Sequence, residues 1–193
     1  MNKLILTALT ASAMIAPSAA LAQQAGGVLV VDTDRILAEC TACRAAATQL
    51  QSQANTLRTR AQTLTTQLQT EGQPLQTAVN ALNGKQPDAA LKARITAYET
   101  KERNARQEIA NGENNLRSIQ ANVQQQLGSR LIQIVEASRA RRNASIAISK
   151  GSTLASATTV DITGEVLTAL NQQLPAVSVT PLPQQQQQPT QGR

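Results

Sequence analysis

The sequence predicts a mostly α-helical protein in which a long helical hairpin, an antiparallel coiled coil, is rooted in a small β body. Two heptad-patterned segments of near-equal length, residues 35–82 and 91–135, are separated by only a short helix-breaking stretch. Short apolar segments suited to strands lie outside both ends of this pair. The composition agrees, because Tyr98 is the single aromatic residue among 193, whereas ordinary globular cores rely on aromatic side chains.

Residues 1–22 have the pattern of a secretory signal peptide. A short positive start at Lys3 precedes an apolar stretch over residues 4–15, and Ala20 and Ala22 form a small-x-small cleavage site. A transmembrane anchor needs about 20 apolar residues, and polar residues and Pro17 interrupt this stretch. We expect cleavage after Ala22 and export of the mature chain.

The first strand of the β body is expected within residues 23–34. The apolar run Val28–Val31 suits a buried strand, and either Thr33 or Asp34 is expected to cap the helix that starts near Arg35. The alternative, an acid–base or metal role for Asp32 and Asp34, lacks any His to complete a usual site.

The hairpin, with the shape of a tentacle, is predicted to span residues 35–143. In its first arm the small or apolar residues recur at alternating intervals of four and three. These seam positions are Ile36, Cys40, Cys43, Ala47, Leu50, Ala54, Leu57, Ala61, Leu64 and Leu68. Alternation of large residues with Ala allows two helices to approach closely. Gly72 and Pro74 predict a kink or a short break further along.

The two cysteines, Cys40 and Cys43, have C-x-x-C spacing and fall on seam positions. After export, a disulfide is favoured. They form either a small buried pair or a local disulfide, an interchain bond between subunits, or a redox or metal site. A metal site would need about two further ligands, so a structural role is the default hypothesis.

The tip of the hairpin is predicted near residues 83–90. Asn83-Gly84 breaks the first helix, Pro87 cannot continue it, and Asp88 can cap the next one. The second seam then contains Leu91, Ile95, Tyr98, Ala105, Ile109, Leu116, Ile119, Val123, Leu127, Leu131 and Ile134. Each arm should span roughly 70 Å.

The remaining strands and a short helix of the β body are predicted within residues 144–174. A strand over 144–149, a turn and a second strand over 153–157 should join the first strand, and Asp161 or Thr163 should cap a helix over 164–173. Residues 175–193 are rich in Pro and Gln and are predicted to be disordered.

Composition argues against several classes of function. Without His, a Gly-rich phosphate loop or a Ser-centred motif, no constellation meets the requirements of catalysis. We therefore predict no enzyme, no catalytic residues, no cofactor and no metal. The net charge of +6 suits acidic partners or anionic lipid, whereas the absence of a basic-aromatic surface argues against nucleic acid.

The order of these elements resembles the Skp/OmpH family of periplasmic outer-membrane-protein chaperones. The residues that carry the resemblance are 28–37, the helical hairpin, 144–149, 160–163 and 166–171. The resemblance implies a periplasmic homotrimer whose small sheets assemble into one body, with three tentacles around a cavity. It also implies that unfolded outer-membrane β-barrels are held there without ATP.

Two groups of side chains are candidates for contact with a client. Residues near the tip are either hairpin seam or client-facing: Leu75, Val79, Leu82, Lys85, Leu91, Ile95 and Tyr98. The candidate basic contacts, which could also meet lipopolysaccharide or anionic lipid weakly, are Arg58, Arg60, Lys92, Arg94, Arg103 and Arg106. The alternative function is a periplasmic structural spacer or scaffold that binds a folded envelope partner.

Overall fold

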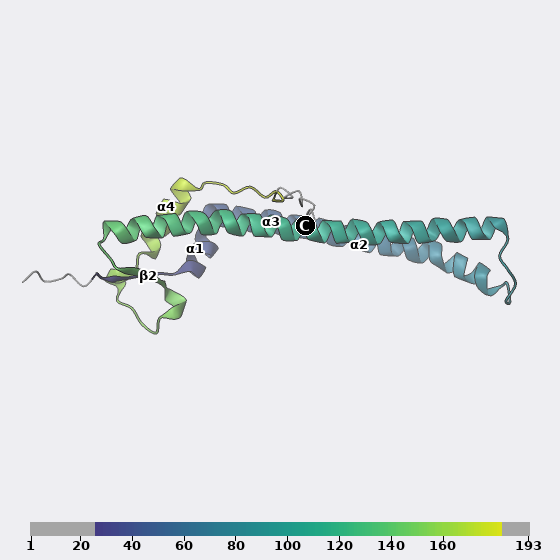
Figure 1. The fold of residues 1–193 in the computed structure, drawn as a ribbon, viewed down its shortest axis with the longest axis horizontal. Helices are drawn as coiled ribbons and strands as arrows, with labels where there is room; N and C mark the ends of the chain where they lie inside the picture. The colour runs from purple at the N-terminus through teal and green to yellow at the C-terminus, as the bar shows by residue number, and fades with distance from the viewer. Residues whose placement is uncertain (1–25, 183–193) are drawn as a thin grey trace, which may run out of the picture.

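The computed structural model describes residues 26–182. The predicted signal peptide with its cleavage site after Ala22 lies outside the described residues, as does the tail from residue 183 onward. Two long helices, α2 (Thr41–Asn80) and α3 (Ala89–Arg141), lie side by side, and all other elements gather at one end (Figure 1). The prediction of a mostly helical chain with a small sheet is confirmed.

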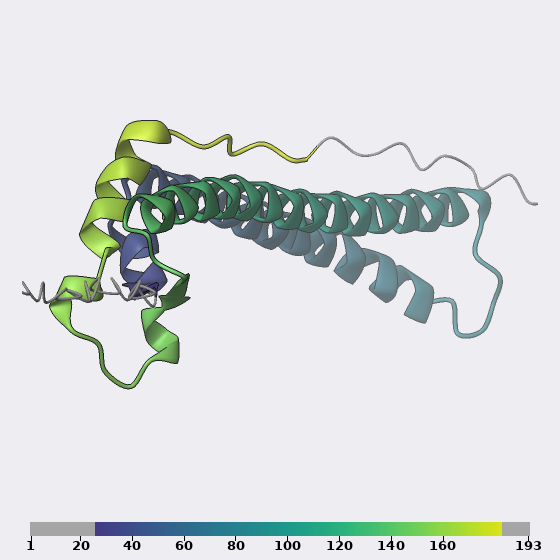
Figure 2. The ribbon, with the colours of Figure 1, turned by 60° about the vertical axis from the view of Figure 1, so that its left-hand side comes forward.

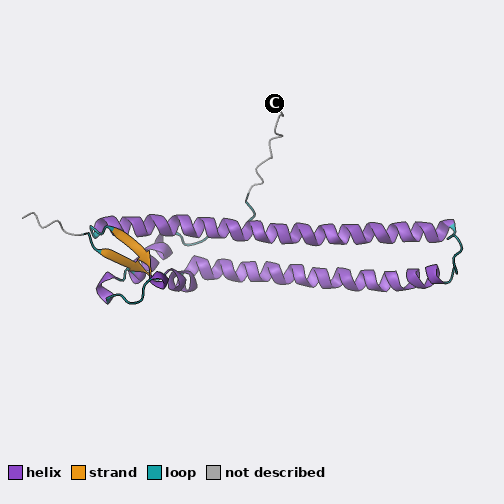
Figure 3. Ribbon diagram, turned by 60° about the horizontal axis from the view of Figure 1, so that its bottom comes forward, coloured by secondary structure: helices purple, strands orange, loops and turns teal. Residues whose placement is uncertain are grey.

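The sheet has two parallel strands, β1 (Val28–Val31) and β2 (Ile146–Ser149), drawn in orange in Figure 3. The predicted strand over 153–157 is wrong. Those residues are irregular and lie between two 3₁₀ turns, η1 (Lys150–Ser152) and η2 (Thr158–Val160). Leu154, the large apolar residue of this stretch, is fully exposed and contributes nothing to the core. The place beside β1 is taken instead by Asp161, which forms a single bridge to Val30.

The first arm is not one continuous helix. Helix α1 (Thr33–Glu39) ends at Cys40, whose extended backbone (φ −66°, ψ 137°) separates it from α2. The cap of α1 is Asp32 rather than Thr33 or Asp34, because its Oδ1 accepts from the Arg35 N–H at 2.9 Å. The heptad pattern therefore continues across a helix break.

Helix α2 continues through Pro74 without the predicted break. Pro74 lies on an exposed face, where water can reach the carbonyl that loses its helical partner. At the tip, Asn83 and Gly84 adopt positive φ (48° and 85°), and Asp88 Oδ1 accepts from the Leu91 N–H at 2.7 Å. These residues reverse the chain and start α3.

The seam between α2 and α3 includes two close contacts at glycines. A Cβ on Gly72 would lie 2.8 Å from the Tyr98 hydroxyl, and a Cβ on Gly112 would lie 2.5 Å from Leu57 Cδ1. Each glycine therefore makes room for a large side chain of the other helix. The remaining predicted seam residues of this part are mostly half-buried.

Near its start the seam is shifted by one residue, because Ala46 is buried whereas the predicted Ala47 is exposed. Helix α2 begins anew at Thr41, and its first turns pack into the hydrophobic core at the base of the hairpin rather than only against α3.

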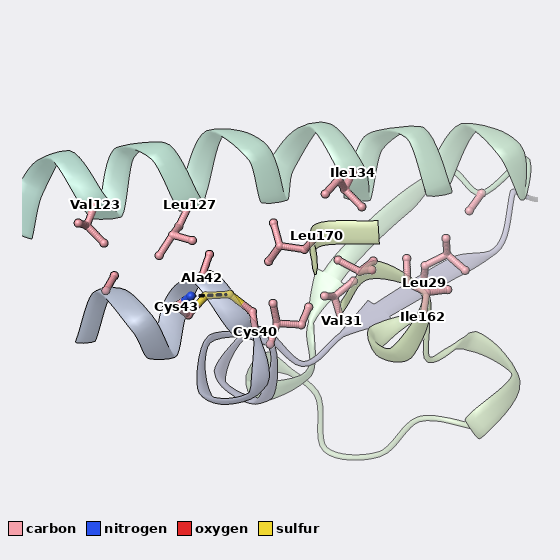
Figure 4. Packing of buried hydrophobic residues seen from close by; sticks show 14 of the residues in the cluster. Leu29, Val31, Cys40, Ala42, Cys43, Val123, Leu127, Ile134, Ile162 and Leu170 are labelled. Carbon is pink, nitrogen blue, oxygen red and sulfur yellow. Dashed lines mark hydrogen bonds between the residues drawn. A yellow bond between two sulfur atoms is a disulfide. The ribbon is translucent and has the colours of Figure 1, made fainter. Parts of the chain in front are cut away.

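We call that base the root: β1, α1, β2, α4 (Thr163–Gln173) and the adjoining ends of α2 and α3. Its core brings together residues from both ends of the chain (Figure 4). The largest fully buried apolar side chains are Ile36, Ile119, Ile162, Val166 and Leu170. Helix α4 starts at Thr163, one residue earlier than predicted, so its N-cap is Ile162 and the predicted caps Asp161 and Thr163 are wrong. Asp161 Oδ1 still accepts from the Thr163 N–H at 2.9 Å, which satisfies one free N–H of the first turn.

Residues 175–182 correct the prediction of disorder for this part of the tail. They leave α4 and run back alongside α3 in an extended conformation (Figure 2). Val177 and Val179 are half-buried against the root core.

Candidate binding surface of the hairpin

An open groove of about 830 Å³ lies between the two helices toward the tip. Four of the predicted tip residues line it, Leu75 and Val79 from α2 and Ile95 and Tyr98 from α3. Leu75 is buried, whereas Val79 is 39% exposed. The groove thus has an apolar floor, which Leu68 and Gly72 extend, and Gln and Glu side chains complete its lining.

The other three predicted tip residues lie outside the lining of this groove. Leu82 and Leu91 are half-buried where the helices end, and Lys85 is exposed in the turn. The structure thus brings four of the seven predicted residues together and leaves three at the very end of the hairpin.

The predicted basic contacts do not form one patch, because two of them are paired with Glu. Arg60 on α2 donates to both carboxylate oxygens of Glu108 on α3, at 2.6 and 3.1 Å. This hydrogen bond raises the pKa of Arg60 and lowers that of Glu108. Arg106 pairs with Glu102 one turn earlier on α3.

The other four predicted basic residues have no carboxylate within 4.0 Å among residues 26–182. Arg58 and Arg103 donate to neutral neighbours, Asn55 and Thr100. Lys92 and Arg94 are exposed on the first turns of α3. Their charges remain free to meet an anionic group.

Threonines make the outer surface of α2 less polar than its composition suggests. Each of these hydroxyls donates to the carbonyl oxygen four residues earlier: Thr48, Thr56, Thr63, Thr65, Thr66, Thr70 and Thr77. The O–H donor of each threonine is already used in this bond, so its competition for the acceptor groups of a bound chain is reduced.

This arrangement of hairpin and root agrees with a family comparison. The model of the family "Outer membrane protein (OmpH-like)" matches residues 27–170. The chain belongs to the OmpH-like family. The earlier resemblance to the Skp/OmpH family is thereby confirmed.

A solved structure agrees with the fold of this OmpH-like chain. The crystal structure of a candidate outer membrane chaperone (OmpH-like) from Caulobacter crescentus superposes with a TM-score of 0.67. The match covers 84% of this chain and 94% of that chain, at 14% sequence identity. The curated proteins contain no match. Within residues 26–182, no helix has both the length and the apolar character needed to cross a membrane.

The root of this OmpH-like chain carries an exposed apolar surface that the sequence analysis did not identify. Ile132 on α3 is 70% exposed and Ile146 on β2 is 48% exposed, and both line a hollow of about 420 Å³ between α3 and β2. We call Ile132 and Ile146 the root patch. The sequence signal was the cluster Leu131-Ile132-Gln133-Ile134-Val135, which is apolar around more of the helix than one seam needs.

Cys40 and Cys43 form a disulfide with each other, with 5.2 Å between their Cα atoms (Figure 4). Both residues are buried in the root core. Cys40 is also the N-cap of α2, because its Sγ accepts from the Cys43 N–H at 3.0 Å. Among residues 26–182, no group of three or more His, Cys, Asp or Glu side chains is placed to hold a metal ion.

Proposed function

We propose that this OmpH-like protein is an ATP-independent periplasmic holdase chaperone, not an enzyme, that binds unfolded outer-membrane β-barrels between its hairpins and prevents their aggregation. The observation that carries the proposal is the groove of about 830 Å³, whose apolar floor stays open to solvent far from the root core. A fully packed coiled coil would leave no such surface.

The hairpin surface supports weak, adaptable holding. It offers partly exposed apolar residues, threonines whose O–H groups already bond to the helix backbone, and a few free cations. These groups can contact an unfolded chain at many points without fixing its conformation. Several weak contacts on linked arms add up to useful avidity. Lys92 and Arg94 are the groups that we expect to meet acidic client segments, anionic lipid or lipopolysaccharide, each weakly.

The root supports assembly into a homotrimer. A two-stranded sheet is marginal by itself, and within the described residues β2 pairs with β1 alone. The root patch includes Ile146 of that sheet, and covering Ile132 and Ile146 would remove their exposed area from water. Three hairpins projecting from one such body would enclose a cavity for the client.

Native mass spectrometry of the mature protein tests both parts. We expect a trimer that takes up a urea-unfolded outer-membrane β-barrel on dilution and ignores the same barrel once folded. A trimer that takes up nothing would instead favour a structural spacer that binds a folded envelope partner. A monomer would contradict the shared root.

Two matched variants separate assembly from client binding. Ile146→Asp places a charge in the root patch and should abolish the trimer. Val79→Asp places the same charge in the distal groove and should preserve the trimer while weakening uptake of the unfolded barrel. If Val79→Asp left uptake unchanged, the groove would not be the client-binding surface.

A further inference from the structure

The extended segment that follows α4 is held on α3 by contacts to its backbone. The side-chain amide of Gln126 pairs with both backbone groups of Ser178. The Ser178 N–H donates to Gln126 Oε1 at 2.9 Å, and Gln126 Nε2 donates to the Ser178 carbonyl at 3.0 Å. One side chain thus makes the pair of hydrogen bonds that a neighbouring β-strand would make.

Two further residues continue this pattern toward the tip. Asn122 Nδ2 donates to the Thr180 carbonyl at 2.9 Å, and the Leu182 N–H donates to Ser118 Oγ at 3.0 Å. We call these three side chains of α3 the amide ladder: Ser118, Asn122 and Gln126. We call residues 177–182 the strap.

The spacing of the amide ladder fits any extended chain. Its members are four residues apart on a helix, which corresponds to about 6 Å. Their partners in the strap are two residues apart in an extended backbone, which corresponds to roughly 6.6 Å. Because the ladder contacts backbone groups, it places little restriction on the side chains that it accepts.

The side chains of the strap add a simple apolar requirement. Val177 and Val179 pack against the root core, whereas Ser178 and Thr180 are exposed. This alternation of apolar and polar residues is the pattern of a strand that is buried on one face. It is also the pattern of a transmembrane β-barrel strand, whose side chains face lipid and lumen in turn.

We propose that the amide ladder is a binding site for an extended client segment with alternating apolar and polar residues, and that the strap occupies this site as an internal competitor. This inference rests on the proposed chaperone function. A tethered competitor acts at an effective concentration in the millimolar range. A client segment must therefore displace the strap before it can occupy the ladder.

The test uses the full mature chain and a labelled synthetic peptide with the sequence of residues 176–182. In the double variant Val177→Asp/Val179→Asp, the strap should leave the ladder. Fluorescence anisotropy should then show peptide binding at least roughly tenfold tighter than in the wild type. The control variant Pro175→Asp/Ala176→Asp carries the same charge at exposed positions outside the strap and should bind like the wild type.

A third substitution locates the binding. Adding Gln126→Ala to the strap variant removes two hydrogen bonds and should weaken peptide binding by roughly tenfold. A strap variant that keeps its helical circular dichroism yet binds the peptide no better than the wild type would overturn the proposal. The strap would then be a structural clasp.

Amide hydrogen exchange tests the wild type without any substitution that could unfold it. Saturating peptide should displace the strap and accelerate exchange at the Ser178 and Leu182 N–H groups. A peptide with both valines replaced by Asp should leave exchange unchanged. Unaltered exchange with the matching peptide would also overturn the proposal. Uptake of an unfolded barrel, measured separately, reports on the chaperone function whichever result is obtained.

Discussion

The root and the distal hairpin, residues 51–118, use the same two long helices but differ in how much side-chain surface they bury. The root surrounds α1, α4 and the base of the hairpin with a continuous apolar core. In the distal hairpin only Leu75 and Ala105 are buried, and the other seam residues are half-buried or exposed. Stability is therefore concentrated in the root, and the distal hairpin keeps its apolar surface available for binding.

The largest expected contrast comes from removing one large side chain from each region. Ile36 is fully buried in the root, so Ile36→Ala should lower the free energy of unfolding by about 4 kcal/mol. Leu64 is half-buried in the distal seam, so Leu64→Ala should cost about 1 kcal/mol. Urea denaturation followed by circular dichroism measures both. Equal costs would contradict the division into a stable root and a lightly packed hairpin.

The disulfide should contribute to the root and not to client binding. The disulfide between Cys40 and Cys43 closes a very short loop and so removes only a little entropy from the unfolded chain. That loss of entropy should stabilise the folded state by about 2 kcal/mol. The double variant Cys40→Ala/Cys43→Ala should therefore lower the melting temperature while leaving suppression of client aggregation intact below that temperature. Loss of that activity in a folded variant would instead indicate a redox role.

Acid should weaken the root through Asp161. Hydrogen bonds from the Thr163 side chain and backbone, with a contribution from Lys150, lower the pKa of Asp161 from 3.8 to about 2. The stabilisation is therefore present above pH 4 and is lost as the pH falls toward 2, with a size of at most about 2 kcal/mol. Unfolding free energies measured across this range should fall less steeply in Asp161→Asn. Asp34→Asn, which removes an exposed carboxylate from α1, is the matched control for the change in net charge.

Sequence patterns predicted the hairpin better than the root. The second seam and the cap at Asp88 follow from local periodicity and cap chemistry. The helix break at Cys40 and the absence of a strand over 153–157 depend on contacts between residues more than 100 positions apart. One example is the Thr41 N–H, which donates to Asn171 Oδ1 at 2.9 Å. No local pattern encodes such a pairing.

The candidate binding residues were only partly predictable for the same reason. Leu75, Val79, Ile95 and Tyr98 follow the seam pattern, and the groove shows how they combine. The amide ladder was missed because Gln and Asn on a helix usually face solvent. The ladder can be recognised as a binding site only together with residues 177–182, which the Pro/Gln-rich composition predicted to be disordered. The alternation of valine with polar residues in that segment was a usable signal.

The smallest expected effect concerns the fit of the distal seam. Gly72→Ala gains about 1 kcal/mol of helix propensity, but its Cβ would lie 2.8 Å from the Tyr98 hydroxyl. Because that hydroxyl ends a side chain at the edge of an open groove, it can move aside. We therefore expect a change in unfolding free energy within about 1 kcal/mol, together with a weaker hold on clients as Tyr98 shifts.

Gly112→Ala is the matched comparison. Its Cβ would meet Leu57 Cδ1 at 2.5 Å, a closer approach than the one at Gly72, so the same substitution should destabilise more. If Gly72→Ala proved the more costly of the two, the groove would be as tightly packed as the rest of the seam.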